Sequence, residues 1–180
     1  MPLKQNYQLM TAEEVQTTLD SLADEILKAN SGRPVVLLGI QRRGVPMARR
    51  MAKRMAQKSK REPRIGTLDI NLYRDDLTRV ASQPVVQKTE VPPNIDDQDV
   101  VLVDDVLYTG RTIRAALDAL CDFGRMRTIQ LVVMIDRGHR ELPIEANFVG
   151  RKITTKDNEV VEVKLREIDG EDAIYVMEKI

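Results

Sequence analysis

The stretch Val100-Val-Leu-Val-Asp-Asp-Val-Leu-Tyr-Thr-Gly-Arg-Thr112 decides the fold of this 180-residue chain. Four apolar residues predict a buried strand, and two adjacent carboxylates, Asp104 and Asp105, come at its end. A Thr-Gly-Arg-Thr turn then opens a helix, whose first backbone N–H groups and dipole favour a bound anion. Because carboxylates accept hydrogen bonds from vicinal hydroxyls, this order predicts a sugar-phosphate site. The alternative is an ordinary strand–turn–helix unit with an acidic end.

Length and composition predict a single domain over residues 1–180 with a substantial core. The chain has 28 basic and 28 acidic residues, so no overall field drives it toward nucleic acid or membrane. The lone Cys121 excludes an intrachain disulfide and is typical of a reducing compartment. The sequence has no apolar run that could span a bilayer, and its polar start lacks a signal-peptide pattern. We therefore expect a soluble, cytoplasmic protein.

Hydrophobic periodicity predicts strands that alternate with helices. Thr11-Ala-Glu-Glu14 is typical of a capping box that begins a helix over residues 12–30. Further helices are expected at 45–59 and 111–123, the second closed by Gly124 as its C′ residue. Strands are expected at 35–40, 65–73, 83–91, 100–103, 128–135, 146–155, 159–168 and 173–178, with 65–73 and 83–91 paired as a hairpin. This alternation predicts an α/β fold, a mostly parallel sheet with helices on both faces.

The opening motif resembles the signature that binds phosphoribosyl diphosphate (PRPP) in type I phosphoribosyltransferases. This resemblance implies the type I fold, with a small hood and a β-hairpin flexible loop. It implies that Asp104 and Asp105 are catalytic, holding the ribose hydroxyls and stabilising the cationic sugar. Mg²⁺ is the expected cofactor, bound through the diphosphate, with the same two carboxylates as candidate ligands. The nucleotide-binding residues that it implies are Val106, Leu107, Tyr108, Thr109, Gly110, Arg111 and Thr112.

Two further loops extend the resemblance. Gly39-Ile-Gln-Arg-Arg-Gly44 resembles the pyrophosphate loop, formed by Gln41, Arg42, Arg43 and Gly44. Its glycines would let the backbone approach a ligand, and either arginine could neutralise the leaving group. Such loops often contain Gly and Arg, however, so the pattern alone leaves this open.

The other loop, Leu72-Tyr-Arg-Asp-Asp-Leu-Thr78, matches the flexible loop that closes over PRPP. The resemblance makes Arg74, Asp75 and Asp76 candidates for catalysis. From charge alone, a solvated hairpin tip is the alternative interpretation.

A fourth segment, Asp136-Arg-Gly-His-Arg-Glu-Leu-Pro-Ile144, follows the last core strand and holds the chain's one histidine. By its place it is the hood over the base, where Asp136, Arg137, Gly138 and His139 are candidates. Arg137 and His139 could contact diphosphate or pyrimidine. A lone histidine is more often structural than catalytic, so the alternative to ligand contact by His139 is a purely structural role.

Tyr108 selects the subclass. Purine-type transferases usually carry an aspartate before the Thr-Gly turn, and a tyrosine cannot handle the base proton in the same way. The three loop sequences together resemble the family of bacterial pyrimidine-operon regulators that are also uracil phosphoribosyltransferases. This resemblance implies conversion of uracil and PRPP to UMP, a homodimer or larger homo-oligomer, and UMP- or UTP-dependent binding of leader RNA. The alternatives are an RNA-binding attenuator or nucleotide sensor with vestigial catalysis, and a purine-type enzyme.

The positions that face RNA in this family are altered. They correspond here to Asp20, Ser21, Asp24 and Glu145, and acids at such positions repel phosphates. A basic cluster between Arg42 and Arg64, with ten Lys and Arg residues and one acid, offers a substitute surface. The alternative is a solvated helix face that attracts PRPP. The residues considered for the substitute surface are Arg49, Arg50, Lys53, Arg54 and Lys58, and Arg140, Arg151 and Lys152 remain as further cations.

Overall fold

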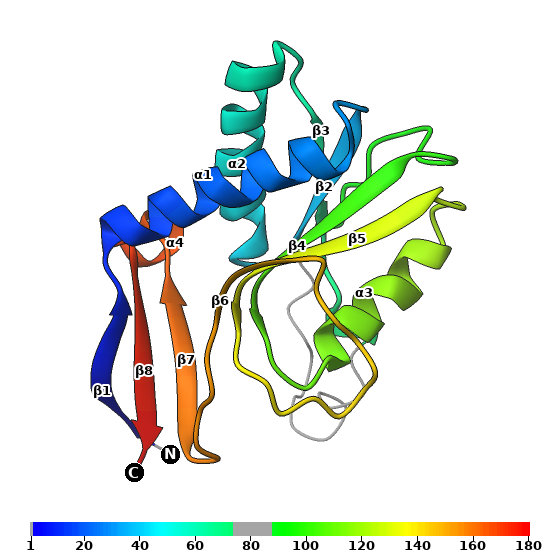
Figure 1. The fold of residues 1–180 in the computed structure, drawn as a ribbon. Coiled ribbons are helices and arrows are strands. Elements are labelled where there is room, and N and C mark those ends of the chain that lie inside the picture. Colours follow the sequence, from blue (N-terminus) through cyan, green and yellow to red (C-terminus); the bar gives the residue numbers. More distant parts are fainter. Residues whose placement is uncertain (1, 74–87) are drawn as a thin grey trace.

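The computed structural model describes residues 2–73 and 88–180, and its elements alternate as the sequence predicts (Figure 1). In chain order the elements are β1 (Leu3–Met10), α1 (Ala12–Ala29), β2 (Val35–Ile40), α2 (Gly44–Ser59), β3 (Arg64–Leu68), a 3₁₀ turn (Asn71–Tyr73), β4 (Asp99–Leu107), α3 (Arg111–Cys121), β5 (Thr128–Asp136), β6 (Phe148–Lys152), β7 (Glu159–Lys164), α4 (Arg166–Asp169) and β8 (Ala173–Lys179).

Five of the described strands form a parallel sheet in the order β3-β2-β4-β5-β6. The central strand is β4, in which Val101 is in register with Leu37 of β2 and Gln130 of β5. Strands buried on both faces are apolar throughout, which explains why Val100–Val103 shows no polar alternation. The opening motif of the sequence therefore forms the middle of the molecule.

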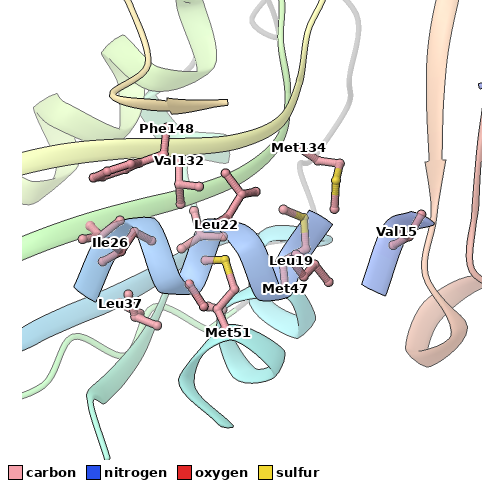
Figure 2. Close-up of a cluster of buried hydrophobic side chains, with 14 of the residues drawn as sticks. Val15, Leu19, Leu22, Ile26, Leu37, Met47, Met51, Val132, Met134 and Phe148 are labelled. Carbon is pink, nitrogen blue, oxygen red and sulfur yellow. The ribbon is translucent and has the colours of Figure 1, made fainter. Parts of the chain in front are cut away.

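Helices cover both faces of this sheet. Alternate strand residues point to opposite faces, so Leu37 packs with α1 and α2 while Leu38 packs with α3. Figure 2 shows the first of these two clusters, in which Leu22 and Met51 lie between the helices and the strands. The predicted arrangement, a parallel sheet with helices on both faces, is confirmed.

The two ends of the chain form a second, antiparallel sheet in the order β1-β8-β7, beside the central sheet (Figure 1). The strand β1 was not predicted. Residues 3–8 are exposed, so their polar sequence carries no apolar period. Pairing with β8 is what holds this segment extended.

Several predicted boundaries are wrong. The strand expected over 65–73 ends at Leu68, and the one expected over 159–168 ends at Lys164, before the short helix α4. The helix α3 ends at Cys121 with Asp122 as its C-cap, so Gly124 lies one residue beyond the C′ position.

The base of the predicted hairpin is present. Thr67 and Glu90 exchange two backbone hydrogen bonds, each 2.9 Å long, in an antiparallel bridge. The part of the predicted strand 83–91 that precedes residue 88 lies outside the described residues.

Candidate functional site

The loops after β2, β4 and β5 leave the same edge of the central sheet, because these strands are parallel neighbours. The structure therefore brings together three of the four segments predicted for the site. The fourth segment begins at Leu72, and its candidate residues Arg74, Asp75 and Asp76 lie outside the described residues.

Two adjoining pockets occupy this edge. The first has a volume of about 320 Å³ and is lined by both carboxylates and by the loop after β2. The second, of about 410 Å³, is lined by residues 106–113 and Glu141. Val106 and Thr112 line both pockets, so the two spaces meet at the predicted phosphate turn. The first pocket is lined by Gln41, Arg42, Arg43, Ile70, Asn71, Asp104, Asp105, Val106 and Thr112.

The two carboxylates are held by backbone amides. Asp104 is buried, and its Oδ1 accepts a 2.9 Å hydrogen bond from the Asp105 amide. Asp105 Oδ1 accepts one of the same length from the Val106 amide. Because β4 continues to Leu107, the carboxylates lie within the end of the strand, and not after it as predicted. Their orientation is fixed before any ligand arrives.

Glycines shape the loop after β2, in which the peptide bond between Gln41 and Arg42 is cis. A Cβ on Gly39 would lie 2.6 Å from the Val45 Cα, and one on Gly44 would lie 2.1 Å from the Val103 carbonyl oxygen. We predicted that these glycines let the backbone approach a ligand. The structure gives a further reason for both glycines, because a side chain at either position would meet other parts of the protein's own backbone, and the approach to a ligand stays a prediction.

The two arginines of this loop differ in their surroundings. Arg43 pairs with Asp169 of α4, through Nε–Oδ2 at 3.2 Å and Nη2–Oδ1 at 2.8 Å. Hydrogen bonding to this carboxylate raises the pKa of Arg43. Arg42 is exposed and has no hydrogen bond or ion pair with another described residue. Of the two, Arg42 has the free guanidinium at the pocket.

The phosphate turn is held in place by its own backbone conformation and by hydrogen bonds to Glu141 and Leu142. Its Gly110 has φ +93°, in the left-handed region that favours glycine. The Thr109 carbonyl accepts hydrogen bonds from the amides of Glu141 at 2.9 Å and Leu142 at 3.2 Å. Arg111 Nε donates to Glu141 Oε2 at 2.6 Å. Since α3 begins at Arg111, the amides of its first turn lie at the second pocket, and the Arg111 amide donates to Thr109 Oγ1 at 3.3 Å.

An aromatic and cationic cluster lies beside this turn. The Arg137 guanidinium lies 4.1 Å from the centroid of the Tyr108 ring, and it donates to Thr155 Oγ1 at 3.1 Å and the Glu159 carbonyl at 2.7 Å. Burial lowers the pKa of Arg137. His139 Nε2 lies 2.7 Å from the Thr155 carbonyl, which can only accept, so this nitrogen carries a proton. A direct ligand contact by Arg137 or His139 stays a prediction.

The remaining two candidates hold the loop itself. Asp136 is buried and pairs with Arg140, and its Oδ1 accepts a 3.0 Å hydrogen bond from the Gly138 amide. Gly138 has φ +75° and open space around its Cα, so its glycine is required by backbone conformation alone.

Sequence reasoning missed the partners that these residues use. Asp169 is 126 positions from Arg43, while Thr155 and Glu159 lie beyond the next strand from Arg137. Long-range side-chain pairs leave no local signal, so nothing in the pattern marked them.

Acids of α1 and cations of α2 are paired with each other. Asp24 accepts hydrogen bonds from Arg54 Nη2 at 3.1 Å and Lys58 Nζ at 2.5 Å, and these cations lower the pKa of Asp24. Arg50 pairs with Asp172 at 2.7 Å. Much of the basic cluster on α2 is therefore neutralised within the protein.

Of the three other cations named for RNA, Arg151 and Arg140 are also engaged, whereas Lys152 is exposed with no pair among the described residues. Arg151 Nη1 donates to the Leu9 carbonyl at 2.7 Å, and Arg140 is largely buried.

In the ranges 2–73 and 88–180, no helix combines the length and apolar character needed to cross a membrane.

Comparisons with known proteins identify relatives of this chain. Residues 8–167 match the model of the phosphoribosyl transferase domain family. The chain is 51% identical over 176 residues to the bifunctional protein PyrR of Pelotomaculum thermopropionicum, covering 97% of each chain. It is 52% identical over 173 residues to that of Thermus aquaticus, covering 96% of each.

Among solved structures, a hypoxanthine phosphoribosyltransferase from Staphylococcus aureus matches with TM-score 0.73 and 24% identity, over 97% of this chain and 92% of that one. At this identity the likeness shows the fold alone, and it does not favour purine bases. The predicted fold and family are confirmed: the chain belongs to the phosphoribosyl transferase domain family and, within it, to the bifunctional PyrR proteins.

Proposed function

We propose that this chain transfers the phosphoribosyl group of PRPP to uracil, giving UMP and diphosphate. The observation that carries the proposal is the meeting of two pockets at the phosphate turn. One holds the paired carboxylates and the arginine loop, and the other holds the start of α3. PRPP carries a sugar between a phosphate and a diphosphate, so it suits a pair of adjoining pockets.

The proposed mechanism is positioning and charge stabilisation. Uracil N1 bonds to C1 of the ribose as the bond from C1 to the diphosphate oxygen breaks, and the N1 proton is lost to solvent; the transition state has oxocarbenium character. Asp104 and Asp105 bind the ribose hydroxyls and stabilise the positive sugar. The residues from Thr109 to Thr112 bind the 5′-phosphate, with the helix dipole in their favour. Arg42 takes up charge on the leaving group, since Arg43 is engaged by Asp169.

The same carboxylates suit Mg²⁺. Within the described parts of the chain, no group of three or more His, Cys, Asp or Glu side chains could hold a metal ion. Magnesium needs only one or two carboxylates when substrate oxygens and water complete its shell, which fits Asp104 and Asp105. When bound, the ion neutralises the diphosphate and improves it as a leaving group.

Two observations support uracil as the acceptor: the residue at position 108 is a tyrosine, and the chain belongs to the bifunctional PyrR proteins. Tyr108 stands where purine-type enzymes usually carry an aspartate, and its ring rests on buried Arg137. We place the base beside the segment from Asp136 to His139. The catalytic roles of Arg74, Asp75 and Asp76 follow from the resemblance.

A substrate panel tests the proposal. Diphosphate release from PRPP with Mg²⁺ is measured for uracil, orotate, hypoxanthine and guanine, and only uracil should support it. Asp105→Asn should lower kcat/KM by about 100-fold or more, as for loss of other groups that stabilise transition-state charge. Asp118→Asn, which changes an exposed aspartate of α3, is the matched control and should be neutral. Activity with purines alone would contradict the choice of base.

We further propose that the chain acts in the cytoplasm as a homodimer or larger homo-oligomer, and that it regulates pyrimidine genes by binding leader RNA with UMP or UTP. The family supports this role, while the charges limit its surface. Asp24 pairs with two cations of α2, Arg54 and Lys58, and Arg49 and Lys53 are the cations of that helix with no pair among the described residues. Binding of the organism's own leader at low salt, with and without UMP, is the test. No binding under those conditions would leave a purely enzymatic protein.

A further inference from the structure

The guanidinium of Arg140 joins the segments that border the proposed site. Its Nε donates to the Ile144 carbonyl at 2.9 Å, its Nη1 to the Tyr108 carbonyl at 2.7 Å, and its Nη2 to both Asp136 carboxylate oxygens at 2.8 Å. Only 24% of the side chain is exposed, and it lines neither pocket. Every nitrogen of this fork thus has a partner in the protein's own framework.

Backbone contacts run alongside this link. The amides of Glu141 and Leu142 both donate to the Thr109 carbonyl, and the Arg137 amide donates to the Leu107 carbonyl at 3.1 Å. A Cβ added to Gly110 would meet Leu142 at 3.4 Å, so turn and segment are already in close contact. The phosphate turn and the base segment therefore pack as one unit.

Within this unit the Arg140 side chain binds three separate positions of the two segments. It reaches back to Tyr108, which opens the phosphate turn, and to Asp136, which opens the base segment. The planar fork of arginine fixes the directions of its donors, whereas a lysine ammonium is a single point charge. The relative placement of the two loops thus depends on a geometry that only arginine supplies.

We propose that Arg140 is a positioning residue that holds the base segment in register with the phosphate turn, so that one nucleotide can occupy both. It touches neither part of the ligand, and it acts through the Tyr108 carbonyl and the Asp136 carboxylate. This inference rests on the proposed function, because it assumes that the turn binds the 5′-phosphate and that residues 136–139 border the base.

Two ligands separate this role from a general loss of structure. UMP needs both loops in register, whereas ribose 5-phosphate needs only the turn and the carboxylates. Arg140→Lys keeps a positive charge beside buried Asp136 and so avoids an unpaired buried carboxylate. Misplacement by about 1 Å can cost up to about 100-fold in catalytic rate, and for equilibrium binding we expect a smaller loss, with UMP binding about tenfold more weakly to this variant. The affinity for ribose 5-phosphate should stay within about twofold, because a ligand held by one loop does not sense the register.

The matched control is Arg127→Lys. Arg127 also forms a two-pronged pair with a buried aspartate, Asp99, but at the opposite, amino end of β4. This control should bind both ligands normally, and thermal unfolding checks that each variant is folded. Equal weakening of both ligands by Arg140→Lys, or no change in UMP binding, would overturn the positioning role. Asp105→Asn tests the assumption separately: if ribose 5-phosphate binding does not respond to it, the site assignment itself fails.

Discussion

Replacing Gly44 with alanine should displace the loop that follows β2. An ideal Cβ at this position would lie 2.1 Å from the Val103 carbonyl oxygen. A carbon–oxygen contact normally needs about 3.3 Å, so α2 and β4 must part by about 1 Å. Alanine favours the helix by up to about 1 kcal/mol, but overpacking costs about 1–3 kcal/mol. We expect the free energy of unfolding to fall by about 1–2 kcal/mol, measured with urea.

The larger effect should be on catalysis, because Gly44 directly follows Arg42 and Arg43. A misplacement of about 1 Å can cost about 100-fold in rate, and we expect kcat/KM for PRPP to fall by about 10- to 100-fold. Gly32→Ala is the control, since Gly32 has φ +71° and no atom within 4 Å of an added Cβ. It should lose about 1 kcal/mol of stability from left-handed strain and keep its kinetics. A folded Gly44→Ala protein with unchanged kcat/KM would refute the reasoning.

Further predictions concern stability and charge. Thr11→Ala should lower the free energy of unfolding by about 1 kcal/mol in urea titrations, since it removes the cap of α1, and an unchanged midpoint would contradict it. Arg127 lowers the pKa of buried Asp99 to about 2, so the stability that this pair contributes is complete above about pH 4 and is lost as the pH falls toward 2. Acid titration of Arg127→Ala should show that loss reduced, and an identical acid transition would contradict the pairing. Asp24→Asn should free two cations of α2, steepening the log–log salt dependence of RNA binding by about 1.5, and an unchanged slope would show that these cations do not reach phosphate.

Local signals in the sequence predicted local structure well. The capping box is present, with the Thr11 amide donating to Glu14 Oε2 at 2.8 Å and the Glu14 amide to Thr11 Oγ1 at 3.3 Å. These bonds span three residues, so the sequence contains both partners side by side. The strand of the opening motif is confirmed but runs longer than predicted, because Val106 and Leu107 still pair with β5. The polar residues Asp104 and Asp105 correctly indicated a site, but pairing with the neighbouring strand β5 determines where β4 ends.

Partners that are distant in the chain could not be predicted in this way. The extended form of β1 depends on β8, more than 160 residues away, and the pairing of Arg43 depends on Asp169. In both cases polar residues bind partners that come close to them only in the tertiary structure. A sequence pattern can predict that a guanidinium is near the site, but not whether another carboxylate already holds it.

The charges of α1 and α2 are another case in which partners distant in the chain decide how side chains act, and here the pairing bears on RNA binding. The sequence presented an acidic position, Asp24, and a basic cluster as two separate observations about RNA. In the structure Asp24 binds both Arg54 and Lys58, so its one negative charge offsets one of their two positive charges and holds both cations in ion pairs. An approaching polyanion therefore meets a weaker positive charge on α2, with Arg54 and Lys58 held by Asp24 and with Arg49 and Lys53 unpaired among the described residues. Catalysis does not depend on these pairs, because Arg42 and the start of α3 already face the pockets.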